Sequence, residues 1–523
     1  MFRSLRHSLH LMGVARVLSR HDALFPKELM ENGPASLRIA RYVTRLGLPG
    51  WAAPRSKDDS KSPGQRLTAA LQSLGPSYIK LGQSLATRAD LVGDEVADAL
   101  SELQDNLPPF PGEVARGIIA DELMSPVDDL FQSFDDIPVA AASIAQVHFA
   151  VTSAGDPVAV KVLRPDVEAA FARDLAPLSW LAGKLERLQP EFRRLRPSDI
   201  VRTFSETVKT EMDLRLEAAA ASELRENMGE DGFVIPEVDW RRTGRRVLTT
   251  ERVEGISITD RAALAAAGHD LPDLAAKLLR GFLTQAMGDG FFHADLHPGN
   301  LFVTSDGRIA AVDFGIMGRL DRNTRRYLAE ILLGFNRADY HAVARVHFDA
   351  GYVPRDKSVG LFAQAMRSVG EPILGRPVRE ISLARLLAQM FQVTKTFDMQ
   401  TQPQLLLLQK TMVVAEGVAQ QLDPDVNTWD ITAPVVEALM RENFSPVTRL
   451  RDALEDGVEM VKRFPELVER AERAAEVIAS GAVKLDPASS RELAAAHTRS
   501  LRPRTVTIWI LGVFALALLA AAL

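Results

Sequence analysis

The spacing of apolar residues changes several times along the chain, and each change predicts a different kind of element. Residues 67–115 carry a helical pattern that two prolines close. Within residues 130–163 the short runs VHFAVTSAG and PVAVKVL meet at a Gly-Asp turn, which predicts strands. Residues 166–228 are helical and highly charged, and RRVLTTERVEG predicts one more strand followed by a turn.

The second half of the chain is mostly helical in pattern. Residues 260–292 predict helices, and the strands NLFVTS and RIAAVDFG flank DGR, which predicts a hairpin turn. From residue 322 nearly all of the pattern up to the carboxyl-terminal apolar stretch is helical. A small strand-rich lobe followed by a helical lobe with one hairpin predicts a two-lobed α+β architecture.

The two ends of the chain differ in hydropathy. Residues 506–523 form an apolar stretch that as a helix would be about 27 Å long, close to the thickness of a bilayer core. Arginines just before it predict a cytoplasmic body, although a buried core helix or an oligomer contact would also explain the stretch. Residues 1–25 are basic and weakly amphipathic, which favours a soluble helix over a helix that docks on a membrane surface.

Composition limits the possible chemistry. The 523 residues are 46 % hydrophobic and 25 % charged, as in folded globular proteins. A net charge of −6 argues against a general nucleic-acid binder. Because the chain has no cysteine, disulfides, Cys-ligated zinc, iron–sulfur clusters and thiol catalysis are excluded, and a reducing compartment fits.

Three short motifs occur in the order and on the elements that a protein kinase requires. VAVK places Lys161 at the end of a strand, HADLHPGN contains Asp295 and Asn300, and DFG begins at Asp313 after the hairpin. Lys161 could neutralise the phosphates of ATP, Asn300 and Asp313 could ligate Mg²⁺, and Asp295 could orient or deprotonate an attacking hydroxyl or water.

Other interpretations of these residues remain open at this point. His293, Asp295 and His297 could bind a transition metal, but alternating residues suit a strand and the Pro-Gly turn that follows disfavours such a trio. The loop could also be structural, or belong to an inactive kinase fold. Lys161 could be a strand-end lysine that extends to solvent.

The chain departs from an ordinary protein kinase in three ways. Alanine replaces glycine in the loop expected to cover the phosphates, which restricts how closely the backbone can approach them and predicts altered nucleotide handling. Residue 294 is alanine where kinases have arginine, and no A-P-E follows the short segment after DFG, which disfavours protein substrates. The candidate nucleotide-binding residues of the alanine-rich loop are Ala140, Ala141, Ala142, Ser143, Ile144, Ala145, Gln146 and Val147.

Six strings together resemble the UbiB family of atypical, protein-kinase-like proteins of isoprenoid-quinone biosynthesis. The resemblance runs over about residues 20–345. The strings are KLGQ (80–83), AAASIAQVH (140–148), VAVKVLRPDV (158–167), EMDLRLEA (211–218), HADLHPGN (293–300) and DFG (313–315). The resemblance implies that the K-x-G-Q helix, with Lys80 and Gln83, folds across the active site. It also implies that Glu211 and Asp213 contact the K-x-G-Q lysine side of the pocket. We expect Glu217 to pair with Lys161, with Glu211 as second choice.

The resemblance further implies a membrane-anchored, Mg²⁺-dependent ATPase or atypical kinase of ubiquinone biosynthesis. Such a protein would sit at the bacterial inner membrane and help polyprenyl-phenol precursors reach soluble enzymes, with other quinone-biosynthesis enzymes as further partners. The adenine of ATP is expected near the connector LTTERVEG, which includes Glu251 and Val253. Bacterial members usually end in two membrane helices, whereas one apolar stretch occurs here. A true protein or small-molecule kinase and a nucleotide-sensing scaffold are the alternatives, and direct ring hydroxylation lacks a flavin or iron motif.

The expected fold class is therefore α+β: a bilobal protein-kinase-like fold with an N-terminal helical K-x-G-Q extension, a helix-rich C-lobe and a C-terminal transmembrane helix. The expected domains are N-terminal helices and linker (1–66), the K-x-G-Q extension (67–115), the N-lobe (116–253), the C-lobe (254–445), C-terminal helices (446–504) and the transmembrane helix (505–523).

Overall fold

The computed structural model describes residues 2–21, 23, 62–86, 94–101, 103, 108–188, 197–229, 232–372, 393–394, 396–399 and 402–443. Within this part of the chain no helix is both long and apolar enough to span a bilayer. The transmembrane helix expected at 505–523, the C-terminal helices expected at 446–504 and most of the expected linker lie outside the described residues.

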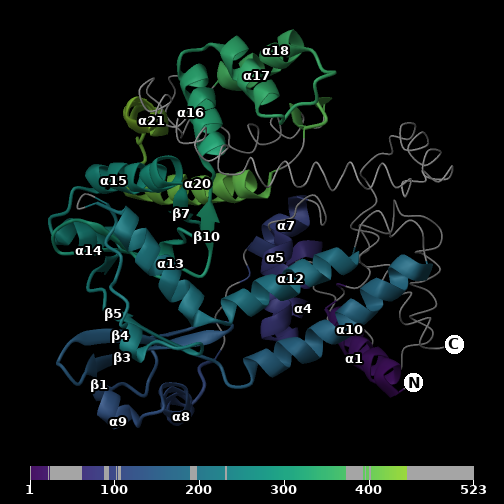
Figure 1. Ribbon diagram of the computed structural model, residues 1–523, viewed down its shortest axis with the longest axis vertical. Coiled ribbons are helices and arrows are strands. Elements are labelled where there is room, and N and C mark those ends of the chain that lie inside the picture. Colours follow the sequence, from purple (N-terminus) through teal and green to yellow (C-terminus); the bar gives the residue numbers. More distant parts are fainter. Residues whose placement is uncertain are drawn as a thin grey trace, which may run out of the picture.

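The smaller lobe is built on an antiparallel sheet in the order β1-β3-β4-β5, with β2 paired to β3 (Figure 1). Its strands are β1 (Phe131–Phe134), β2 (Ala140–Ala141), β3 (Ala145–Thr152), β4 (Pro157–Leu163) and β5 (Val247–Glu251). Val158, Val160 and Val162 alternate along β4 and are all buried. Because side chains alternate between the two faces of a strand, Lys161 projects from the opposite face.

Helices cover both faces of this sheet. The valines of β4 share a buried apolar cluster with Ala115, Ile118 and Ile119 of α8 (Gly112–Leu123), and α9 (Val127–Leu130) precedes β1. The other face meets α13 (Leu214–Asn227), whose N-cap is Asp213. This arrangement points Lys161 toward α13.

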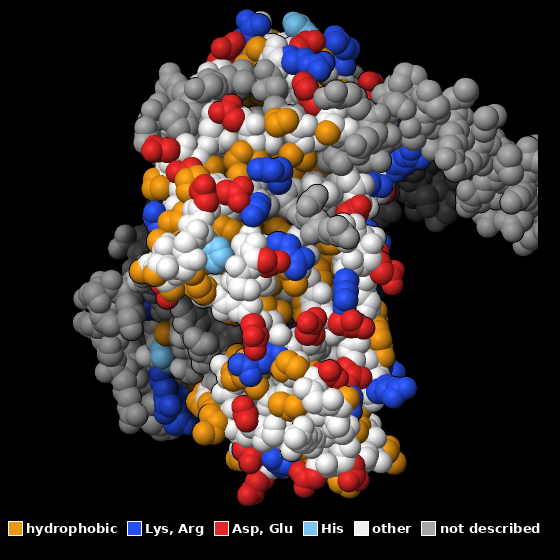
Figure 2. All heavy atoms as spheres, turned by 90° about the vertical axis from the view of Figure 1, so that its left-hand side faces the viewer, with side chains coloured by type: hydrophobic (Ala, Val, Ile, Leu, Met, Phe, Trp, Pro, Cys, Tyr) orange, Lys and Arg blue, Asp and Glu red, His pale blue; other side chains and the backbone are white. Residues whose placement is uncertain are grey.

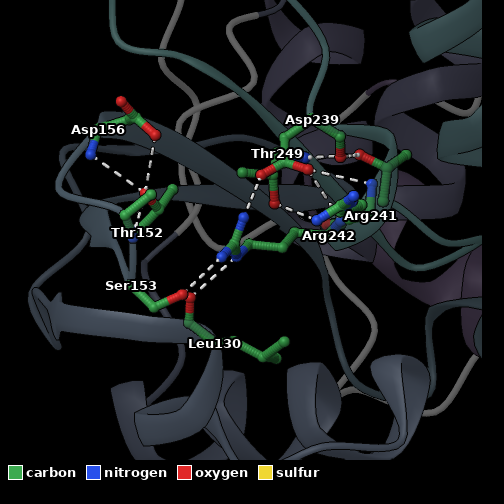
Figure 3. Close-up of polar contacts among 10 residues, drawn as sticks. Leu130, Thr152, Ser153, Asp156, Asp239, Arg241, Arg242 and Thr249 are labelled. Carbon is green, nitrogen blue, oxygen red and sulfur yellow. Dashed lines mark hydrogen bonds and ion pairs between the residues drawn. The ribbon is translucent and has the colours of Figure 1, made fainter.

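An arginine fixes the end of the sheet at which β3 turns into β4. Arg242 lies in the 3₁₀ helix η2 (Trp240–Arg242) and donates to the carbonyl of Leu130 and the hydroxyl of Ser153, each at 2.9 Å (Figure 3). Its own carbonyl accepts from Thr249 Oγ1 at 2.6 Å. These bonds join the residue before β1, the residue after β3 and β5 itself, so the sheet that carries Lys161 is braced at a distance from it.

The larger lobe is mainly helical and carries two small ladders, β6-β8-β9 and β7-β10. Its strands are β6 (Ile256–Ser257), β7 (Phe291–His293), β8 (Leu301–Val303), β9 (Ile309–Ala311) and β10 (Met317–Arg319). Its helices are α14 (Arg261–Ala266), α15 (Leu271–Leu283), the π-helix η3 (Thr284–Asp289), the 3₁₀ helix η4 (Pro298–Asn300), α16 (Arg322–Asn336), α17 (Tyr340–Asp349), α18 (Val359–Gly370), α20 (Pro403–Leu422) and α21 (Thr428–Asn443). The predicted hairpin is confirmed as β8–β9, whereas the helix predicted to reach residue 292 ends at 289.

Four helices near the amino terminus pack beside α10 (Val167–Leu188) and α12 (Pro197–Glu211) (Figure 1). They are α1 (Phe2–Arg20), α4 (Pro63–Leu74), α5 (Pro76–Ala86) and α7 (Asp94–Ser101). They share an apolar cluster of their own that includes Leu18, Tyr78 and Leu100. The K-x-G-Q motif lies on α5, which therefore has its own packed support.

The surface seen from the left-hand side of Figure 1 carries both signs of charge. Figure 2 shows acidic and basic side chains interspersed over both lobes on this face, with apolar side chains between them.

Candidate active site

Three charged side chains from three separate elements meet between the lobes. Lys161 Nζ, on β4, lies 2.7 Å from Glu217 Oε1 on α13 and 3.0 Å from Asp313 Oδ1. The side chains of Lys161 and Glu217 are 17 % and 9 % exposed, whereas that of Asp313 is 48 % exposed. Glu217 is thus the partner of Lys161, as expected, and Asp313 presents its carboxylate to the open side.

The protonation states of these groups depend on one another. Burial alone would lower the pKa of Lys161, but the charges of Asp313 and Glu217 outweigh burial and raise it. Burial raises the pKa of Glu217 to about 7, although Lys161 acts in the opposite direction. The positive charge of Lys161 holds the pKa of Asp313 well below its usual range. At neutral pH the lysine and Asp313 are therefore both charged.

His293 organises the loop that carries Asp295. The histidine is fully buried, its Nδ1 accepts from the backbone N–H of Asp295 at 3.2 Å, and its Nε2 lies 3.2 Å from the carbonyl of Val312. Because Nδ1 accepts, Nε2 carries the proton and donates to Val312. Burial lowers the pKa of His293, which keeps the ring neutral. One imidazole thus links the Asp295 loop to the residue before Asp313.

The β8–β9 hairpin brings the two expected magnesium ligands together. Leu301 pairs with Ala311, and the N–H of Val312 donates to the carbonyl of Asn300 at 2.9 Å. Asn300, just before β8, therefore lies opposite Val312, the residue that precedes Asp313 after β9. Asn300 Nδ2 donates to the carbonyl of Asp295 at 3.1 Å, which fixes the amide group.

Asp313 has an uncommon backbone conformation. Its φ is +64°, in the left-handed region that few non-glycine residues adopt. Phe314 is buried and packs edge-on against His293, with ring centroids 5.5 Å apart. Strained backbone is often retained where a side chain must be aimed, and here the aimed group is the carboxylate beside Lys161.

The transition-metal interpretation of the same loop does not fit the structure. Both ring nitrogens of His293 have partners inside the protein, and His297 Nδ1 accepts from the N–H of Gly299 at 3.1 Å. The described ranges contain no group of three or more histidine, aspartate or glutamate side chains that could hold a metal ion. The donors at Asn300 and Asp313 are instead hard oxygens, which suit Mg²⁺ bound together with phosphates.

The segment after Asp313 forms a strand that pairs with β7. Strand β10 pairs antiparallel with β7, with Met317 opposite His293 and Gly318 opposite Phe292. A Cβ at Gly318 would lie 2.0 Å from the ring of Phe292, so the ladder requires glycine there. Arg319 closes the ladder, since it lies over the Phe291 ring and donates to Glu223 of α13 at 2.8 Å. This segment therefore reaches the α16 N-terminus without an extended loop.

Arg164 fixes the alanine-rich loop through two hydrogen bonds. The guanidinium donates to the carbonyl of Ala142 at 2.9 Å, and the backbone N–H of Arg164 donates to the carbonyl of Ile144 at 2.8 Å. Ala140 and Ala141 form β2, while Ala145 and Val147 begin β3. Ser143 is fully buried.

Gln146 differs from its expected role. Its side chain is 1 % exposed and forms a reciprocal pair with the backbone of Phe110, at 3.0 and 3.1 Å. It therefore ties the preceding segment to the sheet and does not extend toward a nucleotide. A reciprocal amide pair of this kind leaves no sign in the local sequence.

The K-x-G-Q helix reaches the edge of the charged cluster. Lys80 Nζ lies 3.1 Å from Glu211 Oε2, both side chains are largely buried, and the charge of Lys80 contributes to the lowered pKa of Asp313. Gln83 Nε2 donates to the carbonyl of Leu103 at 3.3 Å. A Cβ at Gly82 would lie 2.3 Å from Leu103 and 2.8 Å from Leu71, which explains the glycine of the motif.

Asp213 does not join Lys80 in the structure. Its carboxylate caps α13 by accepting from the N–H of Arg215, and it pairs with the guanidinium of Arg215 at 2.7 Å. Both acidic residues were expected on the K-x-G-Q lysine side of the pocket, whereas the carboxylate of Asp213 binds Arg215. Glu211 is placed as expected, and it is the partner of Lys80, not of Lys161.

The connector between the lobes follows β5. Glu251 ends β5, and Val253 lies in the stretch without regular secondary structure before β6. A Cβ at Gly255 would lie 2.7 Å from the carbonyl of Val303, so the connector passes close to β8. The residues expected near an adenine thus lie at the boundary of the two lobes.

Comparison with known proteins defines the class. Residues 102–347 match the ABC1 atypical kinase-like domain, and residues 366–427 match the UbiB helical domain. A solved structure of Rv3197 with erythromycin, from Mycobacterium tuberculosis, superimposes with a TM-score of 0.50 at 24 % identity, over 80 % of this chain and 96 % of that one. The two-lobed, protein-kinase-like α+β fold is thereby confirmed.

Curated relatives identify the family. A protein of Marinobacter nauticus is 44 % identical over 78 % of this chain and 76 % of its own length. A protein of Xanthomonas euvesicatoria is 42 % identical over 88 % of this chain and 82 % of its own. Both carry the name "Probable protein kinase UbiB". The chain belongs to the UbiB family, which confirms the resemblance carried by its motifs.

Two polar residues near the loop that carries Asp295 were not anticipated. Gln285 is fully buried in η3, and its Oε1 accepts from the N–H of His293 at 3.0 Å. Thr411 is buried in α20, and its hydroxyl donates to the carbonyl of Ala294 at 2.9 Å. A polar residue inside an otherwise apolar helical pattern is the one signal that could have revealed them.

Proposed function

We propose that this protein is a Mg²⁺-dependent ATP-binding ATPase or atypical kinase. The single observation that carries the proposal is the meeting of Lys161, Glu217 and Asp313 between the lobes, with Asn300 placed beside Asp313 by the hairpin. These are the residue types that a phosphoryl-transfer site needs, from the elements that supply them in protein kinases.

Each residue has a role that follows from its position. Lys161 would bind phosphate oxygens, held ready by Glu217, and Asn300 and Asp313 would hold Mg²⁺. A bound Mg²⁺ would neutralise phosphate charge and fix the geometry of the transferred group. Asp295 would orient the acceptor hydroxyl or water and take its proton at the carboxylate. Its loop is fixed through His293, so its position does not depend on a mobile segment.

The acceptor that the arrangement favours is water or a small molecule. Protein kinases bind peptide on the extended segment after DFG. Here that segment is paired in the β7–β10 ladder, and the K-x-G-Q helix reaches the edge of the cluster through Lys80. Both features support ATP hydrolysis over peptide phosphorylation.

The wider process we propose is ubiquinone biosynthesis at the bacterial inner membrane. The protein would couple ATP turnover to the access of soluble enzymes to polyprenyl-phenol precursors held in inner-membrane lipid, and other quinone-biosynthesis enzymes are candidate partners. Membership of the UbiB family supports this role. Membrane anchoring rests on the apolar stretch 506–523 of the sequence.

The test follows the γ-phosphate of labelled ATP with purified full-length protein and Mg²⁺. The proposal predicts label in free phosphate, lost in Asp295→Asn. It predicts no loss in the matched control Asp306→Asn, since Asp306 is an exposed turn residue bound to Thr304 and Arg308. Label on protein or lipid would instead favour a true kinase.

A genetic arm separates catalysis from a scaffold role. A strain that lacks the gene should accumulate an early prenylated intermediate, and wild type should restore quinone whereas Asp295→Asn should not. Full quinone production by Asp295→Asn would show that turnover is dispensable and would favour a nucleotide-sensing scaffold.

A further inference from the structure

A threonine from the helical domain contacts the backbone of the catalytic loop. Thr411 lies on α20, 117 positions from Ala294, and its Oγ1 donates to the Ala294 carbonyl at 2.9 Å. Thr411 is 1 % exposed and Ala294 is 4 % exposed, so water does not replace this bond. Ala294 directly precedes Asp295.

The bond acts on the peptide plane that joins Ala294 to Asp295. A peptide unit is planar, so its carbonyl oxygen and its N–H move together. The oxygen is held by Thr411, and the N–H of Asp295 is held by His293 Nδ1 at 3.2 Å. Because both the C=O and the N–H of this peptide are held, its orientation is fixed. That orientation sets the direction of the Asp295 side chain.

The neighbouring peptide plane is also fixed, by a different element. The N–H of Ala294 donates to the carbonyl of Ile316, in the segment just after Asp313, at 3.0 Å. Thr411 therefore gives α20, which lies outside both the hairpin and the β7–β10 ladder, a hydrogen bond to this loop in addition to their shared apolar cluster. Residues 366–427, which include all of α20, match the UbiB helical domain.

The threonine hydroxyl shares its single proton between two acceptors. Oγ1 also lies 2.9 Å from the carbonyl of Leu407, one turn earlier in α20. A hydroxyl has one hydrogen to donate, so the bond to Ala294 competes with a bond inside the helix. A small rotation of α20 would turn the hydroxyl hydrogen of Thr411 toward the Leu407 carbonyl. The buried Ala294 carbonyl would then lose its donor.

We propose that Thr411 is a positioning residue for Asp295, through which the helical domain sets the geometry of the catalytic loop. Ordinary kinases have arginine at the position of Ala294, and that residue reads the activation segment. In this chain the backbone carbonyl at that position accepts a hydrogen bond from Thr411 of α20. The proposal rests on the proposed function for its kinetic readout, but the loop geometry can be tested without turnover.

The kinetic test compares Thr411→Val, which keeps the shape and removes the hydroxyl, with Thr411→Ser, which keeps the hydroxyl. A displacement of about 1 Å at a catalytic group can cost about 100-fold in rate. We expect Thr411→Val to lower kcat at least about 10-fold while the KM and Kd for ATP stay within about twofold, because the phosphate-binding residues are untouched. Thr411→Ser should restore kcat.

Thr68→Val is the matched control for the loss of a threonine hydroxyl that lies within hydrogen-bond distance of two carbonyls. Thr68 Oγ1 donates to the i−4 carbonyl of Gly64 at 3.0 Å and to the carbonyl of Ala99 on another helix at 2.9 Å. It has the same bonding pattern as Thr411 but lies on α4. We expect Thr68→Val to lower the Tm about as much as Thr411→Val and to leave kcat unchanged.

Hydrogen–deuterium exchange of the peptide covering residues 290–296 tests the geometry directly. Exchange should rise in Thr411→Val and return to the wild-type rate in Thr411→Ser. The proposal is overturned if Thr411→Val keeps wild-type kcat, if kcat and ATP affinity fall together, or if Ser does not restore kcat. If the wild type hydrolyses no ATP, the proposed function fails, and exchange alone then decides the role of Thr411: an unchanged rate overturns it.

Discussion

Lys161 Nζ lies 3.0 Å from Asp313 Oδ1, although the two residues are 152 positions apart and belong to different lobes. The contact requires the alternation of β4, the hairpin β8–β9 and the left-handed backbone of Asp313 to act together. It places the cation for phosphates and the carboxylate for a metal side by side, as one triphosphate with Mg²⁺ would need.

Replacing Lys161 should separate catalysis from folding. Lys161→Met removes the phosphate ligand, so we expect ATP turnover to fall at least about 100-fold. It also leaves Glu217 buried without its partner, which destabilises the fold when Glu217 is charged. Thermal unfolding should therefore show a larger loss of Tm at pH 8 than at pH 6.

The double variant Lys161→Met/Glu217→Met controls for this effect. It should recover most of the Tm of the wild type at pH 8 and remain inactive. Recovery of turnover in the double variant would contradict the role of Lys161.

The pH dependence of stability should report Glu217. Its pKa is raised to about 7 by burial, above its usual value of 4.5. Between these values the folded state binds more protons than the unfolded state, so the contribution of Glu217 to stability is present below about pH 4.5 and is lost as pH rises through 7. We expect the Tm of the wild type to fall more steeply from pH 5 to pH 8 than that of Glu217→Gln. Parallel curves would show that Glu217 does not titrate in this range.

The β7–β10 ladder should depend on one glycine. In Gly318→Ala the new Cβ would collide with the ring of the fully buried Phe292, and overpacking of this kind costs about 1–3 kcal/mol. We expect a lower free energy of unfolding in urea and loss of turnover, because β7 ends at His293.

Two variants test whether this effect comes from the collision. Gly318→Ala/Phe292→Leu should recover part of the stability. Gly117→Ala, on α8 with open space around the new Cβ, should be neutral or stabilising by up to about 1 kcal/mol. A Gly318→Ala protein as stable as the wild type would show that the ladder tolerates a side chain.

The sequence predicted those parts of the site that depend on local pattern. Lys161 is set by the alternation of its strand, and Asp313 and Asn300 by a hairpin with a recognisable turn. The partner of Lys161 could be inferred because the sequence offers acidic residues for it to pair with. Glu217, one turn into its helix, was correctly preferred over Glu211.

What the sequence did not predict depends on contacts to the backbone. Thr411 and Gln146 bond main-chain groups far along the chain, and Gln285 bonds one 8 positions away in the next element. Every residue offers the same N–H and C=O groups, so the sequence does not single out the partner. Asp213 was misplaced because a carboxylate before a helix can cap that helix as well as bind a distant lysine.

The most direct measurement is the position of a divalent ion in the protein with nucleotide. Crystals grown with Mn²⁺ and a non-hydrolysable ATP analogue would locate the ion by its anomalous scattering. We expect a peak about 2.0–2.3 Å from oxygens of Asp313 and Asn300, with the analogue's phosphates beside Lys161 Nζ. An ion bound elsewhere, or phosphates that do not meet Lys161, would contradict it.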